Sequence, residues 1–194
     1  MKNLNDFDLV VLFKQGDNRA FEEILLRYQS HVYTYILSMV RNIDSANDIF
    51  QEVSLRMFKK LKDYKDENKL KNWIFAIAKN MTMDYFRKKK KEFLPIETLE
   101  DPSFLNFISD SSPQQLELLV TNSEIELLKT AVNSLSREER ELIHLKEYLS
   151  FKDIAAIQNK PLGTLLSKFN RALKKIKIFI EKQEKEVDCN EYMR

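Results

Sequence analysis

Hydrophobic residues recur along most of this chain every three or four positions, which is the period of an α-helix with one buried face. The period is clearest in residues 31–41, where the apolar positions are Val32, Tyr35, Ile36, Met39 and Val40. In the first half of the chain the pattern predicts helices over residues 8–13, 18–28, 31–41, 46–61 and 69–91. In the second half it predicts helices from residue 123, over 137–148, over 151–158 and from Pro161 onward.

Residues that cap helices mark several of these boundaries. Asp17 follows Gly16 as an N-cap, and three serines stand three residues before an acidic side chain, as in a capping box: Ser45 with Asp48, Ser136 with Glu139, and Ser150 with Asp153. Near the end of the chain, Asn159 and Lys160 form a predicted turn and Pro161 suits the first turn of the helix that follows. Two helices joined in this way, with the small Ala155 in the first, are the pattern of a helix-turn-helix.

The segment from Phe93 to Leu118 has a different composition from the rest. It contains Pro95, Pro102 and Pro113, five acidic residues and no basic one. Helix cannot persist through this many prolines, so the segment is predicted to be a linker. Its many apolar residues indicate that it packs on something, either its own domains or the groove of a partner.

Composition narrows the fold class. The 194 residues include only two glycines and four prolines, whereas the tight turns of a sheet need glycine. We therefore predict an all-α protein, with two small helical domains joined by an irregular acidic linker and a helix-turn-helix in the second domain. The predicted boundaries are 1–92 and 119–185 for the domains, 93–118 for the linker and 186–194 for a flexible tail.

The remaining composition excludes several functions. Cys189 is the single cysteine, so neither an internal disulfide nor a thiolate metal cluster can form, and no metal or cofactor is expected. There is no glycine-rich phosphate loop and no HExxH helix, and the separated His31 and His144 fit structural roles. No signal peptide or membrane-spanning stretch is evident, so we expect a cytoplasmic protein without membrane insertion.

The final helix is the first candidate site. From Pro161 to Ile180 it has no acidic residue. One face carries Thr164, Ser167, Lys168, Arg171 and Lys175, while Leu162, Leu165, Phe169, Leu173, Ile176 and Ile180 are expected to face a core. The second helix of a helix-turn-helix enters the major groove of DNA. A solvated basic face is the alternative, but the preceding helix and turn favour contact with DNA.

The helix before the linker is the second candidate site. Trp73, Ile77, Asn80, Asp84 and Arg87 share a face, and the run Arg87 to Lys91 follows. An aromatic ring beside amides and cations suits unstacked single-stranded DNA. A core tryptophan and a solvated basic helix end remain the alternatives.

The third candidate site is acidic. Asp48, Gln51 and Glu52 lie together on one helix face, with Asp44 just before them. No histidine or nucleophile lies nearby to support catalysis. The face is either merely solvated or a docking site for a basic partner surface.

These segments resemble a known family, the extracytoplasmic-function (ECF) sigma factors. Residues 10–91 are similar to the family's second domain, in the segments GDNRAFEE (16–23), DIFQEV (48–53), WIFAIAKN (73–80) and DYFR (84–87). Residues 130–178 are similar to its fourth domain, in LSREER (135–140), FKDIA (151–155), PLGTLLS (161–167) and RA (171–172). The two halves occur in the family's order around a linker of suitable length.

The resemblance implies a non-enzymatic initiation factor for bacterial RNA polymerase. It implies that Asp48, Gln51 and Glu52 bind core polymerase. Domain two would melt the promoter −10 element with Trp73, Asn80, Asp84, Arg87 and Lys88. Domain four would read the −35 element with Thr164, Ser167, Lys168, Arg171 and Lys175. The acidic linker would thread toward the RNA exit channel, and an anti-sigma factor would be a further partner.

The sequence departs from the family pattern at a few positions. Ser54 replaces a usual aromatic residue, Leu166 stands where a basic residue is common, and Asn159-Lys160 replaces a turn of glycine and an apolar residue. The loop at Tyr148-Leu149 is shorter than usual. These departures bear on promoter specificity.

Two other classes of function compete with this interpretation. A stand-alone helix-turn-helix repressor or activator would explain the final helix, but not the Asp48 face or the apolar acidic linker. An enzyme would need a nucleophile–base pair or a metal site, and the sequence shows neither.

Overall fold

The chain forms two helical units that are described separately, Met1–Ser112 and Pro113–Arg194. The computed structural model describes residues 1, 3–65, 68–91 and 122–191, and no strand occurs among them. The predicted all-α class is confirmed. The predicted linker at 93–118 and the side chain of Cys189 lie outside the described residues.

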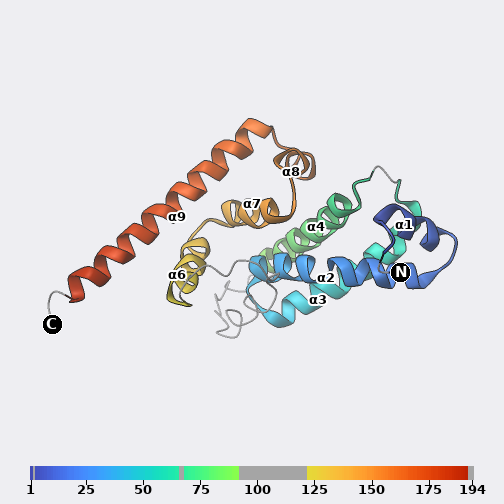
Figure 1. Ribbon diagram of the computed structural model, residues 1–194, viewed down its shortest axis with the longest axis horizontal. Coiled ribbons are helices and arrows are strands. Elements are labelled where there is room, and N and C mark those ends of the chain that lie inside the picture. Colours follow the sequence, from blue (N-terminus) through green and yellow to red (C-terminus); the bar gives the residue numbers. More distant parts are fainter. Residues whose placement is uncertain (2, 66–67, 92–121, 192–194) are drawn as a thin grey trace. The chain divides into compact units, whose positions relative to one another are not determined.

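The first unit is built around one long central helix (Figure 1). Its elements are α1 (Asp6–Lys14), α2 (Asn18–Val40), α3 (Ile43–Lys60), the short 3-10 turn η1 (Leu61–Asp63) and α4 (Leu70–Lys91). Helix α2 packs against α1, α3 and α4. The largest fully buried side chains include Phe13, Tyr35 and Phe75, which come from α1, α2 and α4. Burial of this apolar surface holds the unit together.

Two features of the first unit differ from the sequence prediction. Residues 18–40 form one continuous helix, whereas separate helices were predicted over 18–28 and 31–41. Gln29 and Ser30 interrupt the apolar pattern, but both are exposed on the outside of α2 and neither breaks a helix. Helix α3 begins after Asn42, whose side chain accepts a hydrogen bond from the Ser45 N–H. The N-cap is therefore Asn42, and the prediction of Ser45 is wrong. Asp17 caps α2 as predicted.

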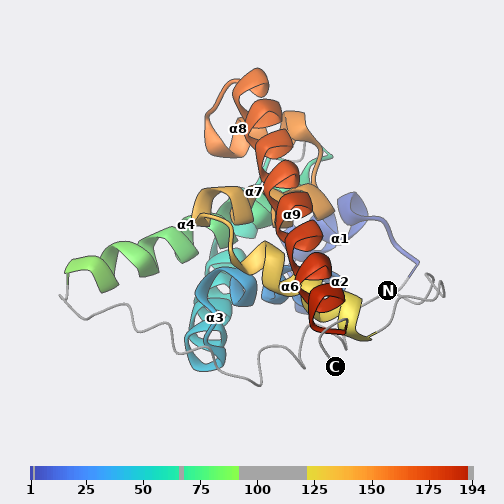
Figure 2. The same cartoon turned by 90° about the vertical axis from the view of Figure 1, so that its left-hand side faces the viewer.

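The second unit contains α6 (Asn122–Asn133), α7 (Arg137–Tyr148), α8 (Phe151–Gln158) and α9 (Leu162–Glu191). Helix α8 lies beside the amino-terminal end of α9 in both views (Figures 1 and 2). The predicted capping box of Ser136 and Glu139 opens α7, and Ser150 caps α8. Helix α9 extends to Glu191, whereas a flexible tail was predicted from residue 186. No glycine or proline follows Gly163 to end it.

The core of the second unit joins α6 to the middle of α9. Ala131 of α6 and Leu135, two residues after that helix, pack with Ala172 and Ile176 of α9, and partly buried hydrophobic residues surround them: Val132, Ile143, Phe179 and Ile180. Leu165 is also fully buried. Leu162 and Leu173, which were predicted to face this core, are instead exposed. Both lie at the edge of the buried stripe formed by Leu165, Ala172 and Ile176, so they stay in contact with solvent.

Candidate polymerase and nucleic-acid interfaces

The turn between α8 and α9 fixes where α9 begins. Asn159 has a left-handed backbone, with φ 50°, and its N–H donates to the Ala155 and Ala156 carbonyls. Asparagine is among the few residues that tolerate this conformation, so it can stand where glycine is more usual. The Lys160 N–H donates to the Ala155 carbonyl at 3.1 Å. The Asn159-Lys160 turn therefore ends α8 with paired backbone groups and starts α9 two residues later.

One ridge of α9 faces solvent near its amino-terminal end. Its side chains are all exposed and follow one another at helical spacing: Leu166, Ser167, Asn170, Arg171 and Lys174. They lie opposite the buried Leu165, Ala172 and Ile176. Arg171 stays close to the helix, with Nε 3.4 Å from the Ser167 carbonyl. We name these five residues the α9 ridge.

The five side chains predicted to read the −35 element do not share one environment. Thr164, Ser167 and Arg171 are exposed. Lys168 and Lys175 are turned toward α7, where they pair with Glu138 and Glu139. Asn170 and Lys174 of the α9 ridge were not among the predicted residues. The available signal was that Leu166, Asn170 and Lys174 follow one another at steps of four, away from the core positions.

Glu139 ties the capping box of α7 to α9. Its carboxylate accepts from the Ser136 N–H at 3.1 Å and from the Ser136 hydroxyl at 2.8 Å. The ammonium of Lys175 donates to it at 2.8 and 3.0 Å. The hydrogen bond from Lys175 is the main cause that holds the pKa of the Glu139 carboxyl below its ordinary value of 4.5, against the opposing effect of burial. Glu139 is only 8% exposed. These bonds therefore take the place of the hydrogen bonds that its carboxylate would otherwise form with water.

Glu139→Ala is expected to destabilise the second unit by about 2 kcal/mol, because it removes a helix cap and a charge-assisted hydrogen bond. The folded-state pKa is lowered, so the carboxylate contributes stability above pH 4.5, and that contribution is lost as the pH falls through the lowered pKa. Hydrogen exchange of the α7 amides, measured in the full chain, should show the deficit at pH 7 and a smaller one below pH 4.5. Glu138→Ala removes the same charge at an exposed position and serves as the control. An equal loss in both variants would contradict the assignment.

The acidic face of α3 borders a groove. Asp48, Gln51 and Glu52 are all exposed, as a docking site requires. Asp48 and Glu52 line a groove of about 620 Å³ whose other wall is α4, while Gln51 does not line it. The walls are joined by hydrogen bonds from Tyr85 to the Ser45 hydroxyl and from Arg56 to the Met81 sulfur, both at 2.9 Å.

Helix α4 separates the residues predicted to bind the −10 element into two groups. Trp73 lies near its start, where its ring packs on Tyr64 with centroids 5.1 Å apart. Asp84, Arg87 and Lys88 line the groove opposite the α3 carboxylates. Asn80 is exposed between the two groups. Trp73 and Asp84 are eleven residues apart, which is about 16 Å along a helix.

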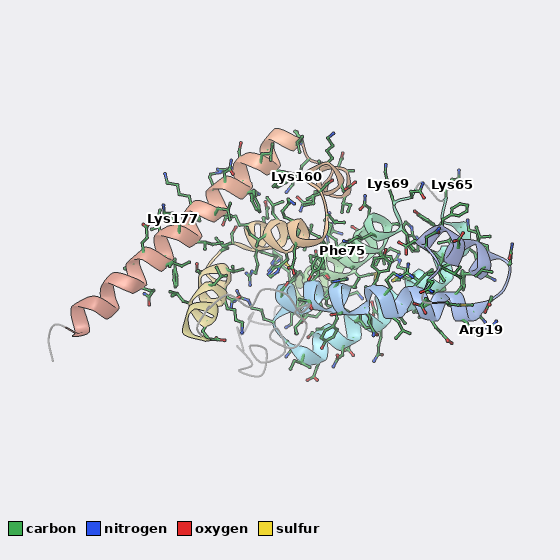
Figure 3. All side chains as sticks on the ribbon, in the orientation of Figure 1. Arg19, Lys65, Lys69, Phe75, Lys160 and Lys177 are labelled. Carbon is green, nitrogen blue, oxygen red and sulfur yellow. The ribbon has the colours of Figure 1, made fainter. Side chains whose placement is uncertain are left out.

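Aromatic and cationic groups at each end of α4 remain accessible. Trp73 is only partly buried, so part of its side chain remains accessible to solvent. Arg87 is 77% exposed and is held by Asp84 at 2.9 Å, which gives Asp84 a positioning role. Figure 3 shows Lys65 and Lys69 at the loop that precedes α4. A stacking ring with cations before and after it suits a single strand of nucleic acid.

No group of three or more histidine, cysteine or acidic side chains in the described part of the chain could hold a metal ion. Within the same residues, no helix combines the length and the apolar character needed to cross a membrane.

Known proteins resemble this chain over most of its length. The family Sigma-70 region 2 matches residues 24–92. The ECF RNA polymerase sigma factor SigM of Bacillus subtilis is 31% identical over 159 residues, covering 81% of this chain and 93% of SigM. The RNA polymerase sigma-H factor of Pseudomonas aeruginosa is 27% identical over 174 residues, covering 86% and 89%. The ECF sigma-E factor of Escherichia coli K12 is 26% identical, covering 88% and 92%.

Solved structures share the fold. The structure of CnrH in complex with the cytosolic domain of CnrY matches with a TM-score of 0.66 and 17% identity, over 91% of this chain and 97% of that one. The Bartonella quintana sigma factor RpoE, in complex with the anti-sigma factor NepR, matches with a TM-score of 0.62 and 22% identity, over 83% and 96%. The helical fold, together with the matched family and relatives, is that of a sigma-70 family protein. Within that family, the chain belongs to the ECF RNA polymerase sigma factors.

Proposed function

We propose that this sigma factor binds core RNA polymerase through the α3 carboxylate face and directs the polymerase to promoters through α9 and α4. Helix α9 reads the −35 duplex, and α4 with the loop before it holds the melted −10 element. The protein has no catalytic role of its own and acts on the polymerase in the cytoplasm. The observation that carries the proposal is that one chain combines an exposed reading ridge after a helix-turn-helix with an exposed carboxylate face on a separate unit.

The proposal assigns a role to each predicted segment of the chain. Residues 1–92 act as sigma domain two and residues 119–185 as sigma domain four. The acidic linker at 93–118 would run toward the RNA exit channel of the polymerase, a basic path that otherwise holds RNA. Residues 186–194 extend beyond domain four.

An anti-sigma factor is the proposed regulatory partner. The sigma factor RpoE of this fold was solved in complex with the anti-sigma factor NepR, and CnrH was solved in complex with the cytosolic domain of CnrY. Such a partner would cover exposed apolar side chains of this chain, among which are Leu26, Leu55 and Leu128.

The central test is transcription with purified components. Start sites mapped after overexpression would identify promoters, which are then transcribed with core polymerase and the purified chain. We expect initiation only when both are present. Tight binding of duplex DNA without any affinity for core polymerase would overturn the proposal in favour of a stand-alone regulator.

The α9 ridge predicts part of the −35 specificity. An asparagine amide can form two hydrogen bonds with adenine, and an exposed leucine can contact the methyl group of thymine. Asn170 and Leu166 are neighbours on the ridge, so we expect adjacent A and T preferences. Asn170→Ala should cost about 1–3 kcal/mol of discrimination at one base pair. Holoenzyme binding to a library of −35 duplexes would measure this.

Lys174→Ala provides the matched control on the same ridge. Lysine that contacts phosphate carries no sequence information, so this variant should weaken binding to all duplexes by a similar factor. If Asn170→Ala also weakened every sequence equally, the role of Asn170 in base reading would be wrong.

A further inference from the structure

One carboxylate holds two lysines at the amino-terminal end of α9. Glu138 forms an ion pair with Lys168 on the second turn of α9 and with Lys160, 3.6 Å away, in the turn before that helix. Figure 3 labels Lys160 at this turn, between α8 and α9. Neither the family resemblance nor the −35 site described above gives Glu138 a role.

The exposure of these groups shows that the pairing is not a buried structural contact. The Glu138 side chain is 62% exposed, Lys160 is 37% exposed and Lys168 is 22% exposed. Ion pairs at this level of exposure contribute little to folding, typically below about 1 kcal/mol. The hydrogen bond from Lys168 is the main cause that lowers the pKa of the Glu138 carboxyl below its ordinary value of 4.5. The main physical effect of this ion pairing is on the electric field around Lys160 and Lys168.

That field lies where DNA phosphates would approach. A recognition helix in the major groove has phosphates along both of its flanks, and lysines at the groove edge bind them without regard to sequence. Lys160 and Lys168 occupy the flank of α9 nearest α7, beside the exposed ridge. While Glu138 holds them, its one negative charge offsets part of their two positive charges and turns both ammonium groups toward α7, so less positive charge is available to attract any duplex.

We propose that Glu138 is a positioning residue that restrains Lys160 and Lys168 and thereby limits binding of α9 to non-promoter DNA. This inference rests on the proposed role of α9 in duplex recognition. The α9 ridge supplies sequence-dependent contacts, whereas the restrained lysines would add only sequence-independent ones. The carboxylate thus raises the ratio of specific to nonspecific affinity without touching a base.

The test compares holoenzymes reconstituted with variant chains, on a promoter duplex and on a scrambled duplex, across a range of salt concentrations. Glu138→Gln should raise affinity for the scrambled duplex roughly two- to tenfold. It should also steepen the dependence of log affinity on log salt by about 1 to 2, since each new phosphate contact adds about 0.9. Affinity for the promoter duplex should rise less, so the specificity ratio falls.

Two controls separate restraint of the lysines from a general loss of negative charge. Glu126→Gln removes an equally charged, exposed carboxylate that pairs with Lys129 on its own helix, and it should leave the salt slope unchanged. Adding Lys160→Met and Lys168→Met to Glu138→Gln should abolish the gain. A merely structural Glu138 would weaken binding to both duplexes equally and leave the slope as it is.

The outcomes also distinguish this inference from the proposed function. If Arg171→Ala weakens promoter binding while Glu138→Gln and Glu126→Gln behave alike, the role of α9 stands and the inference about Glu138 is wrong. If Arg171→Ala has no effect on promoter binding, the proposed reading role of α9 fails first.

Discussion

Asp48→Lys combined with Glu52→Lys is expected to lower affinity for core polymerase by roughly 100-fold or more. Each reversal replaces an attraction by a like-charge contact at the interface, which costs several kcal/mol in total, and about 1.4 kcal/mol corresponds to tenfold. Both side chains are exposed on α3. Their substitution therefore removes no core contact that keeps the unit folded. Competition with another sigma factor for a limiting amount of core polymerase measures the loss.

The control for this variant is a second double reversal in the same unit. Glu22→Lys with Asp63→Lys changes the net charge by the same amount at exposed positions outside the α3 face. It should compete almost as well as the unaltered chain. If the two double variants compete equally, the α3 face is not the docking site. Circular dichroism of both proteins would establish that each remains folded.

Arg171→Ala should weaken binding of the holoenzyme to the −35 duplex by about 10- to 100-fold, because a bidentate arginine contact is worth about 1–3 kcal/mol. Affinity for core polymerase should not change, since the side chain is exposed on the α9 ridge and holds no other helix in place. Fluorescence anisotropy of a labelled −35 duplex, at one fixed salt concentration, gives the ratio.

Arg19→Ala is the matched substitution for this experiment. Arg19 is also exposed, with 78% of its side chain accessible and paired to Asp17 at the start of α2, and its position appears in Figure 3. Removing it subtracts the same charge from the chain, so a loss of −35 binding equal to that of Arg171→Ala would show a net charge effect. An equal loss of core binding and DNA binding in Arg171→Ala would contradict its role as a reader.

Local chemistry in the sequence determined most of the helix boundaries. Ser136 and Ser150 begin α7 and α8 as predicted because a cap needs only its own side chain and the backbone within the next turn. The sequence also placed the chemistry of each surface. The acidic face, the tryptophan helix and the basic final helix depend on spacing along single helices, which the helical period fixes.

Local pattern failed where two signals competed. The apolar period is interrupted at Gln29 and Ser30, yet α2 continues through them because its neighbours bury the flanking turns. Ser45 has the spacing of a cap, but Asn42 lies one turn earlier and takes that place. Contacts with other helices select between such alternatives, and the sequence of one segment does not reveal those contacts.

The sequence by itself determined that this protein is helical, that it carries two basic helices and one acidic face, and that it resembles ECF sigma factors. Only the tertiary structure decided which basic side chains of α9 pair with α7 and which stay exposed. Lys168 and Arg171 are both basic and lie on one predicted face, but α7 places Glu138 beside Lys168 and leaves Arg171 exposed. The physical reason is that Glu138 lies thirty residues from Lys168 in the chain and meets it only when α7 packs on α9. It then pairs with Lys168 and not with Arg171.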